Sequence, residues 1–232
     1  MAEPRIVVTR NGPYRVEGDV KMLRSAPVET EYGEPVDWEY GPEFETRDRM
    51  ELCRCGKSEN KPFCDGTHER IGFVGTQTAE NVPTRERRQT FEGDGVVMTD
   101  DLGFCTHAGF CGDRFTKVWM MIDETSDPEV RARLIDMVEK CPSGRLAYQI
   151  PPDPEDREPE LEPSIGVEPN GPLWVRGGIP VVSEADGTEW EVRNRVTLCR
   201  CGRSRNKPFC DGTHRVNGFT DPAMPRARRQ PT

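Results

Sequence analysis

The sequence predicts an α+β protein with few helices, in which two small β-rich units form a pseudo-two-fold pair around an inserted α+β unit. Three observations predict this arrangement. A segment with three cysteines and one histidine occurs at residues 53–68 and again at residues 199–214. Each copy follows two β-rich segments that are separated by an Asn-Gly turn signal. The stretch between the copies has a different character and contains one clear helical pattern.

The repeat is the most informative of these features. Residues 53–68 read CRCGKSENKPFCDGTH and residues 199–214 read CRCGRSRNKPFCDGTH, so the copies differ only at Lys57 against Arg203 and at Glu59 against Arg205. A Gly-Phe pair follows each histidine at the same distance. Two such motifs in one chain predict an intramolecular pseudo-dimer, and therefore a monomer.

The β-rich segments come first in each half. RIVVTR and YRVEGDV flank Asn11-Gly12-Pro13, and SIGVE and LWVRGGIPVV flank Asn170-Gly171-Pro172. Asn-Gly between apolar runs indicates a turn between two strands. The first half is longer between its turn and its motif. Its extra residues, around Ala26–Phe44, are rich in Pro, Glu and Gly, so we expect a surface loop there.

The spacing Cys-x-Cys-x8-Cys-x3-His brings four side chains together. The first two cysteines lie on an extended stretch, where alternate side chains point the same way. The glycine that follows permits a sharp turn. A helix that starts near Asp65-Gly66 would bring His68 beside Cys64. The candidate ligands are Cys53, Cys55, Cys64 and His68 in the first copy and Cys199, Cys201, Cys210 and His214 in the second.

Thiolates and imidazoles are ligands of both iron–sulfur clusters and zinc. Three cysteines and one histidine are a common zinc set. Zinc modules, however, usually space their cysteines by two to four residues, and Cys-x-Cys is less typical of them. From the spacing alone, both the iron–sulfur and the structural zinc interpretation remain open.

The motif resembles the CDGSH iron–sulfur family, whose pattern is C-x-C-x2-[ST]-x3-P-x-C-D-G-[STA]-H. The family's remaining positions are filled by Ser58, Pro62, Asp65, Gly66 and Thr67, and in the second copy by Ser204, Pro208, Asp211, Gly212 and Thr213. The resemblance implies a [2Fe–2S] cluster in each motif, with two cysteines on one iron and a cysteine and a histidine on the other. It also implies electron transfer or cluster transfer. The chain is more similar to the soluble tandem-motif form than to the membrane-anchored mitoNEET type.

The histidine of each motif has two chemical consequences. A neutral imidazole in place of a thiolate should raise the reduction potential above that of an all-cysteine cluster. It should also make the cluster acid-labile, because a protonated imidazole does not bind iron. We therefore predict cluster loss as the pH falls below neutrality.

The central stretch contains three further cysteines, Cys105, Cys111 and Cys141. Ser126, Pro128 and Glu129 indicate the start of a helix. Its apolar face consists of Val130, Leu134, Met137 and Val138, and it should end near Cys141-Pro142. Short strands are expected at Gly95–Thr99 and Arg145–Ile150.

These three cysteines are not spaced like a zinc finger. Cys105-x5-Cys111 with a distant Cys141-Pro142 is similar to the divergent single-cluster bacterial ferredoxins, with Ala108 at the position of a middle cysteine. The resemblance implies a [3Fe–4S] cluster, or a [4Fe–4S] cluster with a ligand other than cysteine. His107 is the nearest candidate for that ligand, and the alternative is a histidine that lies outside the ligand set. A packed core with three buried cysteines is the alternative to a cluster.

The elements define five segments. They are a β-unit with the first motif (1–80), a divergent ferredoxin-like unit (90–150), a linker rich in Pro and acidic residues (151–163), a β-unit with the second motif (164–221), and a disordered tail (222–232).

Composition excludes several function classes. The chain has 232 residues, of which 34% are hydrophobic, and a net charge of −9. This negative charge argues against nucleic acid as a binding partner. No apolar run is long enough to span a membrane. Nine cysteines in tight clusters indicate metal ligands in a reducing compartment, so we expect a cytoplasmic protein.

We therefore expect an electron carrier that is not itself an enzyme, because no nucleophile motif or nucleotide-binding loop is present. Its partner would be a redox protein or an apo iron–sulfur acceptor protein. The alternatives are a cluster-transfer or redox-sensing protein and a structural zinc module that organises protein contacts.

Overall fold

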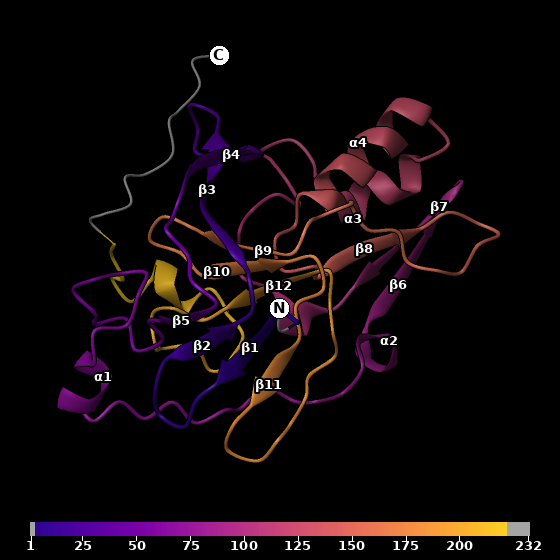
Figure 1. Cartoon of the computed structure of the whole chain (residues 1–232). Coiled ribbons are helices and arrows are strands. Elements are labelled where there is room, and N and C mark those ends of the chain that lie inside the picture. Colours follow the sequence, from indigo (N-terminus) through magenta and orange to yellow (C-terminus); the bar gives the residue numbers. More distant parts are fainter. Residues whose placement is uncertain (1–2, 222–232) are drawn as a thin grey trace.

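The computed structural model describes residues 3–221 and contains three β-sheets with a few short helices (Figure 1). The predicted tail, 222–232, lies outside the described residues. The strands are β1 (Arg5–Val8), β2 (Tyr14–Glu17), β3 (Lys21–Glu29), β4 (Pro35–Glu43), β5 (Arg49–Leu52), β6 (Gln89–Gly93), β7 (Val96–Asp100), β8 (Leu146–Gln149), β9 (Ser164–Val167), β10 (Leu173–Arg176), β11 (Val181–Ser183) and β12 (Arg195–Leu198). The α-helices are α1 (Thr67–Arg70), α2 (Thr84–Arg87), α3 (Val118–Met121) and α4 (Pro128–Glu139), and short 3₁₀ turns lie at Leu102–Phe104, Ile122–Glu124 and Thr213–Arg215.

The two halves of the chain exchange strands. One sheet has the order β11-β1-β2-β5 and another has the order β12-β10-β9-β3-β4. Each half forms a hairpin, β1–β2 or β9–β10, and sends its next strand into the sheet of the other half. β11 pairs in parallel with β1, and β3 pairs in parallel with β9. The predicted pseudo-two-fold pair is therefore built by an intramolecular strand exchange.

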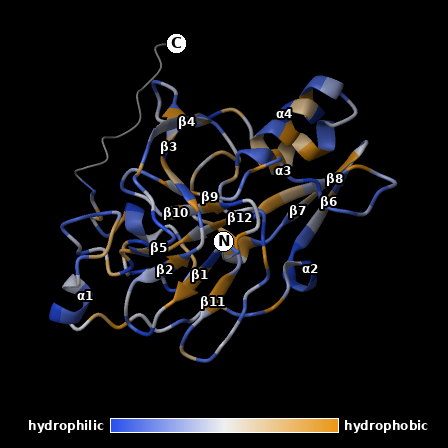
Figure 2. Ribbon diagram, viewed as in Figure 1, coloured by the Kyte–Doolittle hydropathy of each residue, from blue (hydrophilic) through white to orange (hydrophobic). Residues whose placement is uncertain are grey.

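The shared core explains why these short segments are strands. The apolar residues of β1, β2, β9, β10 and β12 are buried, including Ile6, Tyr14, Ile165 and Leu198. Figure 2 shows these strands as the hydrophobic centre of the molecule, with hydrophilic loops around them. The Asn-Gly turns lie where they were predicted, and Asn11 and Asn170 adopt left-handed backbone conformations.

The prediction of a surface loop around Ala26–Phe44 is wrong. This segment forms most of the β3–β4 hairpin at the edge of the five-stranded sheet. Met22 and Ala26 are buried, and the ring of Trp38 lies 4.5 Å from Trp174 and 4.8 Å from Phe110. Packing of these side chains outweighs the turn-forming composition that suggested a loop.

The central unit is a three-stranded sheet, β6-β7-β8, that packs against α3 and α4. Helix α4 begins at Pro128, as predicted, but its N-cap is Asp127 rather than Ser126, and the Asp127 side chain accepts a hydrogen bond from Glu129 N. The helix ends at Glu139, before Cys141. β7 and β8 correspond to the two expected strands, and β6 was not predicted.

Within residues 3–221, no helix is both long and apolar enough to cross a membrane.

Candidate metal centres

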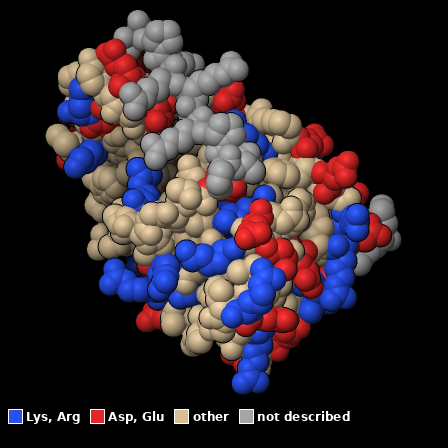
Figure 3. Space-filling model, turned by 90° about the vertical axis from the view of Figure 1, so that its left-hand side faces the viewer, with Lys and Arg blue, Asp and Glu red and all other residues tan. Residues whose placement is uncertain are grey.

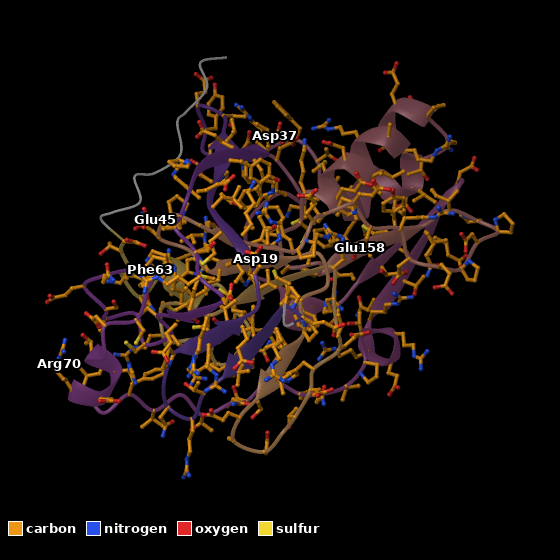
Figure 4. The ribbon with its side chains drawn as sticks, in the orientation of Figure 1. Asp19, Asp37, Glu45, Phe63, Arg70 and Glu158 are labelled. Carbon is orange, nitrogen blue, oxygen red and sulfur yellow. The ribbon has the colours of Figure 1, made fainter. Side chains whose placement is uncertain are left out.

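The first motif is fixed to the end of β5. The amide of Cys53 donates to Pro62 O at 2.8 Å, and the amide of Cys64 donates to Glu51 O at 2.8 Å. Residues Leu52 and Phe63 form an antiparallel bridge between these two bonds. The chain thus folds back on itself and places Cys64 beside Cys53. Figure 4 shows Phe63 toward the interior, where its ring meets Phe44 with the centroids 6.2 Å apart, and Arg70 at the periphery.

Two polar residues of the motif shape the loop between the cysteines. Ser58 donates its hydroxyl to Phe63 O at 2.6 Å and accepts from Asn60 N at 3.0 Å. Asp65 accepts from Glu59 N and from Thr67 N, at 2.8 Å and 3.0 Å. These bonds hold the carboxylate in its charged form and keep the pKa of Asp65 low. Asp65 therefore caps the short turn that carries His68.

The ligand side chains lie in two close pairs. The Sγ atoms of Cys53 and Cys55 are 3.9 Å apart, and Cys64 Sγ is 3.3 Å from His68 Nδ1. Two sulfur ligands at about 2.3 Å from one tetrahedral metal ion are separated by ~3.8 Å. Each pair therefore has the separation of two ligands on a single metal ion.

The second motif repeats this geometry. Cys199 Sγ and Cys201 Sγ are 3.8 Å apart, and Cys210 Sγ is 3.3 Å from His214 Nδ1. In the described part of the chain, no three His, Cys, Asp or Glu side chains converge as a group on one metal ion. Each motif therefore presents its ligand side chains as two separate pairs.

The two motifs differ in burial. Cys210 and His214 are buried, whereas Cys64 and His68 are partly exposed. Helix α1, which carries His68, lies at the outer edge of the molecule (Figure 1). The first motif is therefore the one whose histidine-bearing side reaches solvent.

The motifs touch each other through their Cys-Gly turns. A Cβ on Gly56 would lie 2.7 Å from Cys201 O, and a Cβ on Gly202 would lie 2.8 Å from Cys55 O. Both glycines have positive φ angles, of 76° and 75°. Each glycine thus serves its own turn and also leaves space for the backbone of the other motif.

Sequence reasoning missed the arginine between the two cysteines of each motif. Arg54 and Arg200 are each 1% exposed. Arg54 donates to Gly12 O at 2.9 Å and to Thr9 O at 3.0 Å, and Arg200 donates to Gly171 O and Glu168 O at 3.0 Å and 2.6 Å. They tie each motif to its own Asn-Gly turn. The identity of this residue in both copies is the signal that could have revealed it.

The electrostatics favour the thiolate at only one cysteine of each Cys-x-Cys pair. The neighbouring thiol raises the pKa of Cys55 and Cys199, and burial raises the pKa of Cys64 and Cys210. The hydrogen bond from the neighbouring thiol lowers the pKa of Cys53, and likewise that of Cys201, to about 6. Burial lowers the pKa of His214 to about 4, with further contributions from Arg215 and Arg200. His214 is therefore neutral at neutral pH, one thiol of each Cys-x-Cys pair loses its proton most readily, and binding of a metal would displace the protons of the remaining thiols.

The three central cysteines also lie near one another. Burial raises the pKa of the Cys111 thiol, and the charges of Cys141 and Cys105 raise it further. Arg145 donates to Cys105 Sγ at 3.1 Å and holds Asp100 with two bonds, of 2.6 Å and 2.7 Å. Burial opposes the charge of Arg145, but its bonds to Asp100 and Cys105 outweigh burial and raise its pKa. A fixed positive charge beside the Cys105 sulfur suits a site for a negatively charged cluster.

His107 is exposed, and its backbone is left-handed, with φ 56°. Its ring lies against Gly212 of the second motif, because a Cβ on Gly212 would be 2.7 Å from His107 Cδ2. The predicted role of His107 as a cluster ligand stays a prediction.

Comparison with protein families gave two matches. The model described as "iron-binding zinc finger CDGSH type" matches residues 11–69 and 170–215, and that of the divergent 4Fe-4S mono-cluster family matches residues 91–150. A search of curated proteins gave no match.

Proposed function

Because the chain contains two CDGSH-type iron-binding regions around a divergent mono-cluster region, we propose that it is an electron carrier with up to three iron–sulfur clusters. Each CDGSH motif would hold a [2Fe–2S] cluster, and Cys105, Cys111 and Cys141 would hold a [3Fe–4S] or [4Fe–4S] cluster. Such clusters accept and release single electrons at potentials that the surrounding protein adjusts.

The observation that supports this proposal most directly is the pairing of ligands in both motifs. Two cysteine sulfurs 3.8–3.9 Å apart and a sulfur–imidazole pair at 3.3 Å suit two metal ions that share bridging atoms. The structural zinc alternative needs four ligands around one ion instead.

The residues around the ligands support retention of the cofactor during electron exchange. Arg54 and Arg200 place a buried positive charge beside each Cys-x-Cys pair and fix its backbone. Ser58 and Ser204 brace the loops that carry the remaining ligands. A rigid, pre-organised ligand set reduces the rearrangement that accompanies a change of charge. We therefore propose a carrier that performs no enzymatic reaction of its own.

We propose that the partner is another redox protein. The face that carries α1 has Lys and Arg interspersed with Asp and Glu and separated by uncharged surface (Figure 3). A mixed surface of this kind is typical of short-lived contacts between electron-transfer proteins rather than of a permanent interface.

A second function, cluster donation to an apo acceptor protein, is favoured by one observation. Cys64 and His68 are partly exposed, so an incoming thiolate could reach the metal ion they hold. The same exposure is absent at Cys210 and His214. If donation occurs, the first motif is therefore the donor.

Anaerobic purification with iron, sulfide and zinc analysis tests the proposal. We expect a coloured protein with inorganic sulfide and electron paramagnetic resonance (EPR) signals after reduction with dithionite. A colourless sample that holds zinc and no sulfide contradicts it.

Incubation with an apo-ferredoxin then separates the two iron–sulfur functions. Reversible reduction with retained clusters supports electron carriage. Rapid loss of the [2Fe–2S] absorption to the acceptor supports donation instead.

A further inference from the structure

The loop that carries Cys105 is seated on the second CDGSH motif. Gly212 lies between two ligands of that motif, and a Cβ there would be 2.7 Å from His107 Cδ2 and 2.9 Å from Thr106 O. His107 has a φ of 56°, which few residues other than glycine adopt. A backbone held in this conformation indicates that the surrounding contacts fix the position of the loop.

Other contacts join the same two segments. Asn206 donates to Gly103 O at 2.7 Å, and the rings of Phe104 and Phe209 have centroids 4.9 Å apart. Near the third central cysteine, Arg195 of β12 donates to Cys141 O at 2.9 Å. Both parts of the central ligand set are thus fixed to the strand and loop that carry Cys199 and Cys210.

The first motif contacts the second motif on a different side. Gly56 lies against Cys201, and Gly202 lies against Cys55, as described above. Thr78, which follows the first motif, donates its hydroxyl to Arg205 O at 2.7 Å. The first and second motifs are therefore direct neighbours.

The central unit meets the N-terminal half elsewhere, on the β3–β4 hairpin. The rings of Trp38 and Phe110 have centroids 4.8 Å apart, and Arg114 N donates to Glu34 at 2.7 Å. Figure 1 shows α1, which carries His68, at the edge of the molecule opposite α4 and β6–β8. The second motif thus contacts both other ligand sets through its own loop.

From this arrangement we propose that the second motif is the intermediate station of a three-centre relay, between the central cysteines and the first motif. The inference rests on the proposed electron-carrier function. In each step one electron leaves one ligand set and enters its neighbour, no proton is transferred and no covalent bond changes. A low-potential one-electron reductant supplies the electron at one end of the relay, and an oxidised one-electron redox protein accepts it at the other end.

The buried arginines also connect the first and second motifs. The charge of Arg54 acts on Cys199 as well as on Cys55, and the charge of Arg200 acts on Cys53. The charge of Arg200 is compensated by a buried ion pair with Asp221, whose side chain is 1% exposed. Arg54 has Gly75 in place of the aspartate, and its Nη1 atom has no hydrogen-bond partner among the described residues.

A redox titration of the intact protein, followed by EPR, tests the order of the centres. His68→Cys and His214→Cys each change the spectrum of one motif, so they assign the two [2Fe–2S] signals. In the unaltered protein, we expect the spin relaxation of the second-motif signal to follow the redox state of the central cluster. The first-motif signal should not follow it.

Relaxation that follows the central cluster only at the first motif, or equally at both motifs, would overturn the order. In either case the clusters are present and the carrier function stands. Absence of iron, sulfide and every EPR signal would instead contradict the proposed function itself.

Two variants test the contact between the central loop and the second motif. After flash photoreduction, His107→Ala should slow electron arrival at the second motif, whereas Leu102→Ala, in the same exposed loop, should not. An unchanged rate in His107→Ala with all clusters retained would remove the His107 contact from the route.

Discussion

At the scale of single residues, the two motifs are chemically alike but have different surroundings. Both contain the Cys-Arg-Cys triplet, and both arginines are buried beside thiols. Because a guanidinium remains charged at every physiological pH, Arg54 places a permanent positive charge near Cys199 and Cys55, and Arg200 places one near Cys53. The second copy adds two buried carboxylates, Asp221 and Glu168. Near-identical ligands can therefore differ in potential and in pH response.

His68→Cys and His214→Cys should each retain their cluster and resist acid. In the native protein the rate of cluster loss should rise as the pH falls, because protonation removes an imidazole ligand, and burial, which lowers the pKa of His214 to about 4, should delay this loss at the second motif. Decay of the visible absorption measures this rate. An unchanged pH profile in both variants would contradict the ligand assignment.

Glu168→Gln should stabilise the protein in mildly alkaline solution. Burial raises the pKa of Glu168 from 4.5 to about 7, and its Oε2 has no hydrogen-bond partner. Since the unfolded chain loses this proton first, stability is lost as the pH rises from about 4.5 to 7, by roughly 3 kcal/mol in total. Thermal unfolding should show the gain of the variant at pH 8 and almost none below pH 4.5.

Glu184→Gln is the matched control for this carboxyl group. A hydrogen bond from Arg15 lowers the pKa of Glu184, so its removal should give no alkaline stabilisation. Equal gains in the two variants would show that the effect is not due to burial of Glu168.

The ligand residues could be predicted from the sequence because their chemistry is local. Four side chains with fixed spacing meet within one loop, and the Asp65 and Ser58 bonds that shape it also lie within the motif. Arg54 and Asp221 could not be predicted in the same way. Their roles depend on Gly12 and Arg200, which lie in other parts of the chain.

At the scale of elements, pairing between distant segments determines which ambiguous segments form strands. The Asn-Gly hairpins and α4 were predictable, since turn residues and helical periodicity are local signals. The β3–β4 hairpin was not. β3 is a strand because it pairs with β9, which is distant in sequence. The composition of residues 26–44 does not indicate this pairing.

Arg195 is the element-scale link between β12 and the central unit. It is 1% exposed and donates to Val138 O, Glu139 O, Cys141 O and Leu146 O, and its Nε pairs with Glu158. Figure 4 labels Glu158 in the interior of this view rather than at its periphery.

Arg195→Met should destabilise the protein by about 3–5 kcal/mol, because it leaves a carboxylate and several carbonyl groups without a partner. Urea unfolding measures the loss. Arg157→Met, which removes an exposed ion pair with Asp153, should cost less than about 1 kcal/mol. Similar losses in the two variants would show that Arg195 does not hold the units together.

At the scale of the whole molecule, the strand exchange joins two halves that are separated in sequence by the central unit. β11 completes the sheet of the first half and β3 extends the sheet of the second. Every ligand set is then held by contacts that cross from one half to the other or to the central unit. Domain boundaries drawn along the chain therefore describe composition better than they describe folding.

We predict that the protein is a monomer in solution, because the pairing of the CDGSH motifs is already complete within one chain. Sedimentation velocity should give the mass of a single polypeptide over a wide range of concentrations. A dimer whose two motifs of one chain lie far apart, as measured by spin–spin distances, would contradict this arrangement.

The crossing of β3 and β11 has a consequence for fragments of the protein. A polypeptide ending before residue 90 would retain β3 without β9 to receive it, and it would lack β11. In a dimer of such a fragment, each copy could supply a strand to the incomplete sheet of the other copy. Cutting the chain between its halves should therefore yield either a homodimer of one fragment or a reassembled heterodimer of both, in preference to two independently folded pieces.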